Sequence, residues 1–138
     1  MEEFSLAVKS FVVNKNQQLL IIRRRKNDVH CPGVWEFPGG RLRAGEDPSE
    51  GLKRETEEET GIQIEVQNPL SVHHFTRNDG QRITMIVFLC RPITIDVKLS
   101  EEHTDFDWIQ LTRATEKLDK NFHTEIEIYH KHFNNAAS

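Results

Sequence analysis

Three glutamates are spaced so that a helix would bring their carboxylates onto one face. Glu55, Glu58 and Glu59 stand at positions i, i+3 and i+4, and side chains three or four residues apart are neighbours on a helix. Like charges at that separation repel by roughly 0.2–0.5 kcal/mol per pair. A bound hard cation such as Mg²⁺, which takes carboxylate and carbonyl oxygens, would relieve this repulsion. The spacing therefore indicates a metal site, whereas the charge pattern alone favours a solvated acidic surface.

The residues around these glutamates carry the signals of a helix with defined ends. Asp47 is a good N-cap, Pro48 suits the first helical position, and Gly61 stands where a left-handed C-terminal cap would lie. We therefore expect a helix over residues 48–60. Leu52 is essentially its only apolar residue, so it lacks the apolar stripe of an ordinary core helix.

The segment from Gly40 to Ile62 resembles the Nudix box, the signature of hydrolases that act on nucleoside diphosphates linked to another moiety. The match is GRLRAGEDPSEGLKRETEEETGI, in which every charged and glycine position agrees. Thr56 departs from the pattern, because the family usually has a bulky aliphatic residue there. The resemblance reaches from the first expected strands to Trp108. It implies a single domain over residues 1–138. The expected fold class is α/β (α+β), in the form of an α/β/α sandwich with a central mixed sheet.

The resemblance also implies roles for individual residues. Family members hold Mg²⁺ or Mn²⁺ with box carboxylates and one backbone carbonyl from the loop before the helix. Arg54 resembles the residue that orients the glutamates, with Glu46 as an indirect partner of the metal site. The expected metal ligands are Gly39, Glu55, Glu58, Glu59 and Glu102, and the expected catalytic residues are Arg54, Glu55, Glu58 and Glu102.

A glutamate outside the box completes this expected site. Glu102 precedes Trp108 by six residues, where MutT-type members place a metal-binding glutamate. The sequence does not distinguish which of Glu55, Glu58 and Glu102 acts as the general base.

Two further segments resemble the MutT branch, whose members sanitise nucleoside triphosphate pools. The strand ending LIIRR and the segment EFPGG carry this resemblance. It implies that Arg24 contacts phosphate, that the EFPG segment borders the purine, and that Asn121 reads the base. The expected substrate-binding residues are Arg24, Glu36, Phe37, Pro38 and Asn121.

Three functions compete at this point. The leading hypothesis is Mg²⁺-dependent hydrolysis of a nucleoside triphosphate to the monophosphate and pyrophosphate. The second is hydrolysis of ADP-ribose or another dinucleotide, although such enzymes often carry N-terminal extensions or additional acidic loops. The third is a non-catalytic nucleotide-sensing domain, which loss of box carboxylates would favour.

The composition narrows the partners. The chain has 138 residues, 36% of them hydrophobic and 29% charged, with a net charge of −4, which argues against general binding to nucleic acids or anionic membranes. Its two cysteines, Cys31 and Cys90, are expected to be free thiols. We find no signal peptide and no apolar run long enough to span a bilayer. We expect a cytoplasmic monomer or homodimer that binds a small nucleotide, with no nucleic-acid polymer and no membrane as partner.

Hydrophobic periodicity and turn residues predict the remaining elements. Strands 6–13 and 18–22 are expected to form a hairpin, as are strands 70–76 and 82–90 around Asn78-Asp79-Gly80. Further strands are expected over 35–37, 62–66, 93–97 and 105–110, and helices over 112–120 and 122–133. The second helix carries an apolar stripe of Phe122, Ile126, Tyr129 and Phe133, which indicates core packing. The seven histidines show no ligand spacing and are expected to be surface or packing residues.

Overall fold

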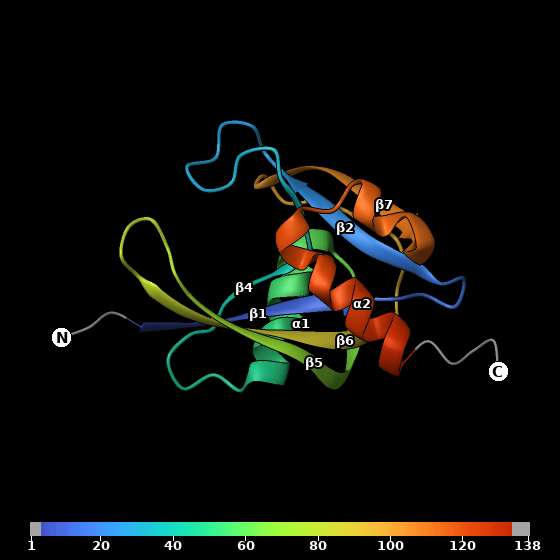
Figure 1. Cartoon of the computed structure of the whole chain (residues 1–138), viewed down its shortest axis with the longest axis horizontal. Helices are drawn as coiled ribbons and strands as arrows, with labels where there is room; N and C mark the ends of the chain where they lie inside the picture. The colour runs from blue at the N-terminus through green and yellow to red at the C-terminus, as the bar shows by residue number, and fades with distance from the viewer. Residues whose placement is uncertain (1–3, 134–138) are drawn as a thin grey trace.

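Two β-sheets and two α-helices form layers in the computed structural model, which describes residues 4–133 (Figure 1). The larger sheet has the strand order β4-β1-β6-β5, with β1 at Phe4–Val12, β4 at Gly39–Arg41, β5 at Ile64–Thr76 and β6 at Arg82–Pro92. The smaller sheet has the order β3-β2-β7, with β3 at Trp35–Glu36, β2 at Gln18–Arg24 and β7 at His103–Gln110. No helix among the described residues is long and apolar enough to cross a membrane.

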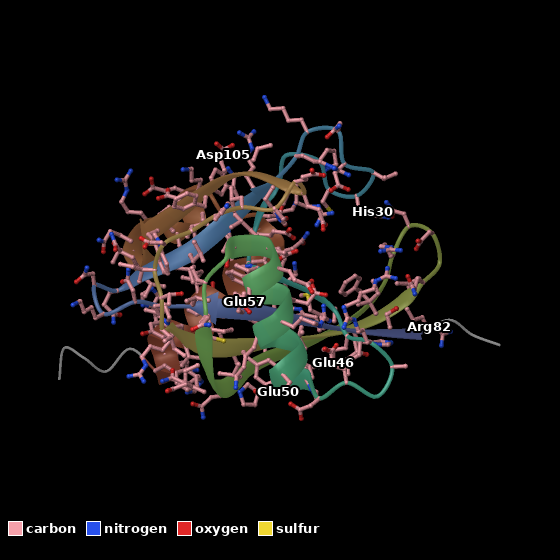
Figure 2. The ribbon with its side chains drawn as sticks, turned by 180° about the vertical axis from the view of Figure 1, so that it is seen from behind. His30, Glu46, Glu50, Glu57, Arg82 and Asp105 are labelled. Carbon is pink, nitrogen blue, oxygen red and sulfur yellow. The ribbon has the colours of Figure 1, made fainter. Side chains whose placement is uncertain are left out.

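The helices lie on opposite sides of the larger sheet, α1 (Pro48–Thr60) behind it and α2 (His123–His132) in front in Figure 1. Figure 2, seen from behind, places α1 in front of the sheet, with Glu50 and Glu57 directed away from it. Because β1 runs parallel to β6 and antiparallel to β4, the larger sheet is mixed. The expected α/β/α sandwich with a central mixed sheet is confirmed.

The expected hairpin between the first two strands is wrong. β1 and β2 belong to different sheets and share only the isolated bridge between Val13 and Leu19. Burial explains the difference, because β1 is covered on both faces, with Val8 on one and Phe11 on the other, and both are fully buried. A strand covered on both faces belongs in the middle of a sheet, where β4 and β6 occupy its two edges.

The helix at 48–60 is confirmed with the expected ends. The Asp47 carboxylate accepts a hydrogen bond from the Glu50 amide at 3.0 Å, and Gly61 adopts the left-handed conformation at φ +75°. Leu52, its single large apolar side chain, is fully buried. Local capping residues therefore define the ends of this helix, and Leu52 is its large apolar contact with the core.

Other elements differ from the expectation. The strands expected at 62–66 and 70–76 are one strand, β5, interrupted by bulges on either side of Pro69; a proline lacks the N–H that a regular ladder needs. No strand forms over 93–97, where Ile93 and Ile95 are both 63% exposed. The helix expected at 112–120 is a 3₁₀ turn over Leu111–Glu116, and a shorter one over Lys120–Phe122 leads into α2.

The predicted apolar stripe of α2 packs into the core. Ile126 and Tyr129 are buried, and the Phe122 ring lies 4.8 Å from that of Phe37. Phe133 is 36% exposed and stacks on Tyr129. Core packing is thus the role of Ile126 and Tyr129 in this stripe.

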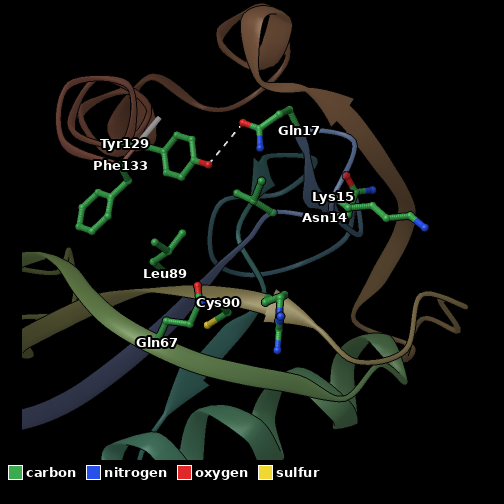
Figure 3. Close-up of a pocket in the computed structure, with 10 residues that line it drawn as sticks. Asn14, Lys15, Gln17, Gln67, Leu89, Cys90, Tyr129 and Phe133 are labelled. Atoms are coloured by element: carbon green, nitrogen blue, oxygen red, sulfur yellow. Dashed lines mark hydrogen bonds between the residues drawn. The ribbon is translucent and has the colours of Figure 1, made fainter. Parts of the chain in front are cut away.

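A small cavity of about 280 Å³ lies at the far end of the same core cluster (Figure 3). The Tyr129 hydroxyl points across it toward Gln17, 3.4 Å from the side-chain oxygen, and Leu89 forms part of its wall. None of the residues that the sequence marks as functional lines this cavity. Cys90 lines it as a buried free thiol, while the other free thiol, Cys31, is exposed.

Thr56, the departure from the family pattern, has a specific partner. Its side chain is fully buried against β1, and its hydroxyl lies 3.1 Å from that of Ser10, which is also fully buried. The Ser10 hydroxyl in turn donates to the Pro38 carbonyl at 3.2 Å. A polar pair therefore replaces an aliphatic contact between helix and sheet.

This pair predicts a coupled effect on stability. Thr56→Val should reduce the free energy of unfolding by about 1 kcal/mol, because a buried hydrogen bond is lost. The double variant Ser10→Ala/Thr56→Val should lose less than the sum of the two single variants. Urea unfolding of the four proteins measures this coupling, and strictly additive losses would show that the two hydroxyls act independently.

Candidate active site

A cleft of about 840 Å³ opens on the face of the larger sheet that α2 covers. Its floor includes one row of directly paired residues that crosses all four strands: Arg41 on β4, Ala7 on β1, Met85 on β6 and His73 on β5. Glu55 and Glu59 of α1 line the cleft next to β4, and Glu102 enters from the loop before β7. The cleft thus has an acidic end at β4.

Glu59 and Gly39 form the joint between helix and sheet at this acidic end. The Gly39 amide donates to the Glu59 carboxylate at 2.7 Å. Gly39 has φ +140°, and a Cβ there would clash with the Val8 carbonyl oxygen, so the position requires glycine. Burial raises the pKa of Glu59 to about 7, although Lys9 and the Gly39 amide both oppose the shift.

Arg54 connects three glutamates. Its guanidinium holds Glu46 with two hydrogen bonds, at 2.8 and 2.9 Å, and reaches Glu55 at 3.1 Å and Glu58 at 3.2 Å. The pair between Arg54 and Glu58 stands at i, i+4 on the helix. These contacts suit an orienting role for Arg54. Glu58 is directed toward this arginine and does not line the cleft.

The carboxylates at the acidic end influence one another. Burial raises the pKa of Glu55 above its ordinary value, and Glu58 and Glu102 raise it further, against the opposing effect of Arg54. Within residues 4–133, no three histidine, cysteine or acidic side chains already converge closely enough to hold a metal ion. The donor set nevertheless fits a hard cation. Burial disfavours the charged forms of Glu55 and Glu59, and a cation bound between them would stabilise those charges. Carboxylate oxygens are also the ligands that such a cation prefers.

A buried ion network forms the wall of the cleft beside this end. Glu36 is buried and accepts from Lys9 at 3.1 Å, from Arg24 at 3.1 Å and from His103 at 2.9 Å. Burial alone would raise its pKa, but Lys9, His103 and Arg24 outweigh burial and lower the pKa to about 2. Glu36 is therefore a permanent anion surrounded by cationic groups. Lys9 also donates to the Phe37 carbonyl at 3.2 Å and so fixes the segment that leads to Gly39.

Arg24 lines the cleft, and all three of its guanidinium nitrogens donate hydrogen bonds within the protein. Nε donates to the His30 carbonyl at 3.0 Å, Nη1 to Glu36 at 3.1 Å and Nη2 to Asp28 at 2.8 Å. The side chain is 19% exposed. The residue thus anchors the loop after β2, while a contact with substrate phosphate stays a prediction.

The other expected substrate-binding residues lie at different depths. Phe37 is fully buried in the core, 5.4 Å from the Phe11 ring, and Pro38 is buried behind the cleft wall. Asn121 is exposed and lines the cleft, next to Phe122. Contact of Phe37 and Pro38 with substrate stays a prediction, and their position supports the wall from behind.

Sequence reasoning missed Lys9, His103 and His73. A signal for Lys9 was present in the sequence. It is the single charged residue in an apolar strand, and alternate side chains of a strand share a face, so Lys9 lies on the same face as the buried Ala7 and Phe11. His103 carried no spacing signal. Its imidazole is fully buried, and Nδ1 has no hydrogen-bond partner within residues 4–133.

Comparisons with known proteins agree with this geometry. A model of the NUDIX domain matches residues 3–131. A MutT-like protein from Streptomyces ambofaciens is 36% identical over 114 residues, covering 83% of this chain and 69% of that protein. Nucleoside triphosphatase NudI from an Enterobacter strain is 26% identical over 130 residues, which cover 87% of this chain and 92% of that protein.

Among solved structures, the MutT protein from Methanosarcina mazei Go1 superposes with a TM-score of 0.84 at 27% identity, covering 97% of this chain and 98% of that one. Several other matched relatives are longer proteins, and this chain spans between 28% and 40% of their length.

The raised pKa of Glu59 predicts how metal-free stability depends on pH. The folded state binds a proton that the unfolded state has already lost, so stability should fall as the pH rises from about 4.5 to 7, by about 3 kcal/mol. Glu59→Gln removes this loss while keeping an oxygen for the Gly39 amide. Urea unfolding in EDTA at pH 4.5 and pH 8 measures the difference between variant and wild type. A difference that does not change with pH would show that Glu59 titrates normally.

Proposed function

Because this chain belongs to the Nudix hydrolase family, whose members are pyrophosphohydrolases acting on nucleotides, we propose that it cleaves a nucleoside triphosphate to the monophosphate and pyrophosphate with Mg²⁺. The observation that carries the proposal is one cleft whose lining includes two unlike sets of residues. Glu55, Glu59 and Glu102 form the acidic set, and Asn121 and Phe122 form a neutral set with an amide and an aromatic ring. A nucleotide has two matching parts, phosphates that bind through cations and a base with polar edges and an aromatic face.

The acidic end provides what hydrolysis at phosphorus needs. Such a reaction requires neutralised phosphate charge, an activated water and alignment for attack. Glu55, Glu59, Glu102 and the Gly39 carbonyl would hold Mg²⁺, which supplies charge neutralisation and lowers the pKa of water. Arg54 keeps the glutamates in position through its contacts with Glu55 and Glu58.

Among Glu55, Glu58 and Glu102, we favour Glu55 and Glu102 as candidates for the general base. A base must reach the attacking water, and Glu58 does not line the cleft, whereas Glu55 and Glu102 do. Glu55 already accepts from Arg54. Glu102 is exposed in the cleft and has no ion pair among the described residues.

The preference for a triphosphate rests on two supports. The NudI relative, named as a nucleoside triphosphatase, aligns over most of both chains. Cationic side chains also border the acidic end, since Arg41 and Lys9 line the cleft near Gly39 and Gly40. Such a border suits a substrate with three phosphates.

Turnover should require a divalent cation. Hydrolysis of a panel of ribo- and deoxynucleoside triphosphates and ADP-ribose should occur with Mg²⁺, increase toward alkaline pH as the attacking water deprotonates, and stop in excess EDTA. Product identification should find monophosphate and pyrophosphate. Full turnover in EDTA would contradict the metal mechanism, and a tenfold preference for ADP-ribose over every triphosphate would contradict the substrate assignment alone.

Two variants separate phosphate recognition from base recognition. Arg24→Ala should lower kcat/KM about equally for all triphosphates, because phosphate oxygens carry no base identity. Asn121→Ala should change the ranking of bases, since a lost hydrogen bond to a buried base edge costs roughly 1–3 kcal/mol. Steady-state kinetics over the same panel provide the measurement. An unchanged ranking in Asn121→Ala would exclude that residue from reading the base.

A further inference from the structure

Glu125 is a buried carboxylate on α2 that the proposed hydrolysis does not use. Its side chain is fully buried, and Oε2 lies 2.9 Å from Nε2 of His73. Its other oxygen, Oε1, is buried without a hydrogen-bond partner among the described residues. Burying a carboxylate this way is costly, and apolar residues would stabilise the fold equally well. Stability therefore gives no reason for the pair.

His73 connects this buried carboxylate to the cleft. Its imidazole lines the cleft and is 28% exposed, so the ring meets Glu125 on one side and the cavity on the other. His73 stands on β5, at the opposite edge of the sheet from β4. Three strand spacings of about 4.8 Å separate those edges, which places His73 about 14 Å across the floor from the acidic end. Asn121 and Phe122, just before α2, line the cleft as well.

The two ring nitrogens of His73 have different surroundings. Nε2 lies 2.9 Å from Oε2 of Glu125 and 3.5 Å from the Ser71 hydroxyl. When Nε2 of a neutral imidazole donates to a carboxylate, Nδ1 is an acceptor. Within residues 4–133, Nδ1 has no hydrogen-bond partner of its own.

Resting on the function proposed above, we propose that His73, whose Nε2 donates to Glu125, is a determinant of base specificity beside Asn121. Nδ1 accepts a hydrogen bond from an amino group of the nucleobase. Substrate phosphates carry no such donor, so this contact acts on the base alone. A base without the amino group leaves Nδ1 unpaired in the cleft and is disfavoured. The pair thus selects among nucleotides after the acidic end has bound their phosphates.

Substrates that differ by one amino group test the proposal. The pairs are ATP against purine riboside triphosphate, GTP against ITP, and CTP against its pyrimidin-2-one analogue. The wild-type enzyme should prefer the amino base tenfold or more in kcat/KM in at least one pair. Equal efficiency within all three pairs would overturn the proposal.

Variants assign the preference to His73. His73→Phe alone would leave the buried Glu125 carboxyl without its hydrogen-bond partner, which is destabilising, so the informative protein is His73→Phe/Glu125→Met. It replaces the pair with apolar side chains and should fold and hydrolyse triphosphates, with the amino-base preference reduced to about one. The matched control is His132→Phe, an exposed histidine of α2 outside the cleft, which should keep the wild-type preference. A folded double variant that keeps the preference overturns the proposal.

Nitrogen-15 NMR of the imidazoles gives a result that does not depend on turnover. At assay pH, His73 should carry hydrogen on Nε2 only, and its Nδ1 resonance should shift when an amino-bearing nucleoside monophosphate is added. Hydrogen on Nδ1, or on both nitrogens, would overturn the proposal. Failure of the wild type to hydrolyse any triphosphate would refute the proposed function instead, and the NMR titration would still decide the role of His73.

Discussion

The hydrogen bond from the Gly39 amide to Glu59 is the contact on which the rest of the site depends. It joins the edge strand of the larger sheet to the helix that carries the acidic residues, inside a buried region where both partners are fixed. Together with the hydrogen bond from Arg54 to Glu55, it positions the carboxylates of the helix against the Gly39 backbone. The close approach of Val8 makes glycine obligatory at this point, so a backbone constraint and an ionisable group are linked directly.

Two buried glutamates near this contact show how neighbours determine the behaviour of the same side chain. Glu36 has two cationic partners, Lys9 and Arg24, and a hydrogen bond with His103, and its pKa falls to about 2. Burial dominates for Glu59, and its pKa rises to about 7. The first is a fixed charge that keeps Lys9 and Arg24 in the cleft wall. The second, Glu59, has a pKa near neutrality, so a cation bound beside it would favour its ionised form. Such a group suits a residue that shares a cation with the substrate.

Local signals in the sequence were sufficient for α1, because Asp47 and Gly61 act within one turn of its ends. The acidic face also followed from spacing alone. The pairing of β1 with β6 and the ion network around Glu36 were not predictable in this way, since they join residues far apart in the chain. No signal in the sequence marks Glu125 as buried, and only the tertiary packing of α2 against β5 reveals it.

The parallel pairing of β1 with β6 has a consequence for how the chain acquires its shape. Val12 pairs with Cys90, so the central ladder closes only after most of the chain is available, and the entropy of that long loop must be overcome first. During synthesis from the N-terminus, α1 and β4 emerge well before the strand that completes their sheet. An emerging chain therefore exposes the apolar faces of β1 until β6 arrives, and that interval is when it is most prone to aggregate.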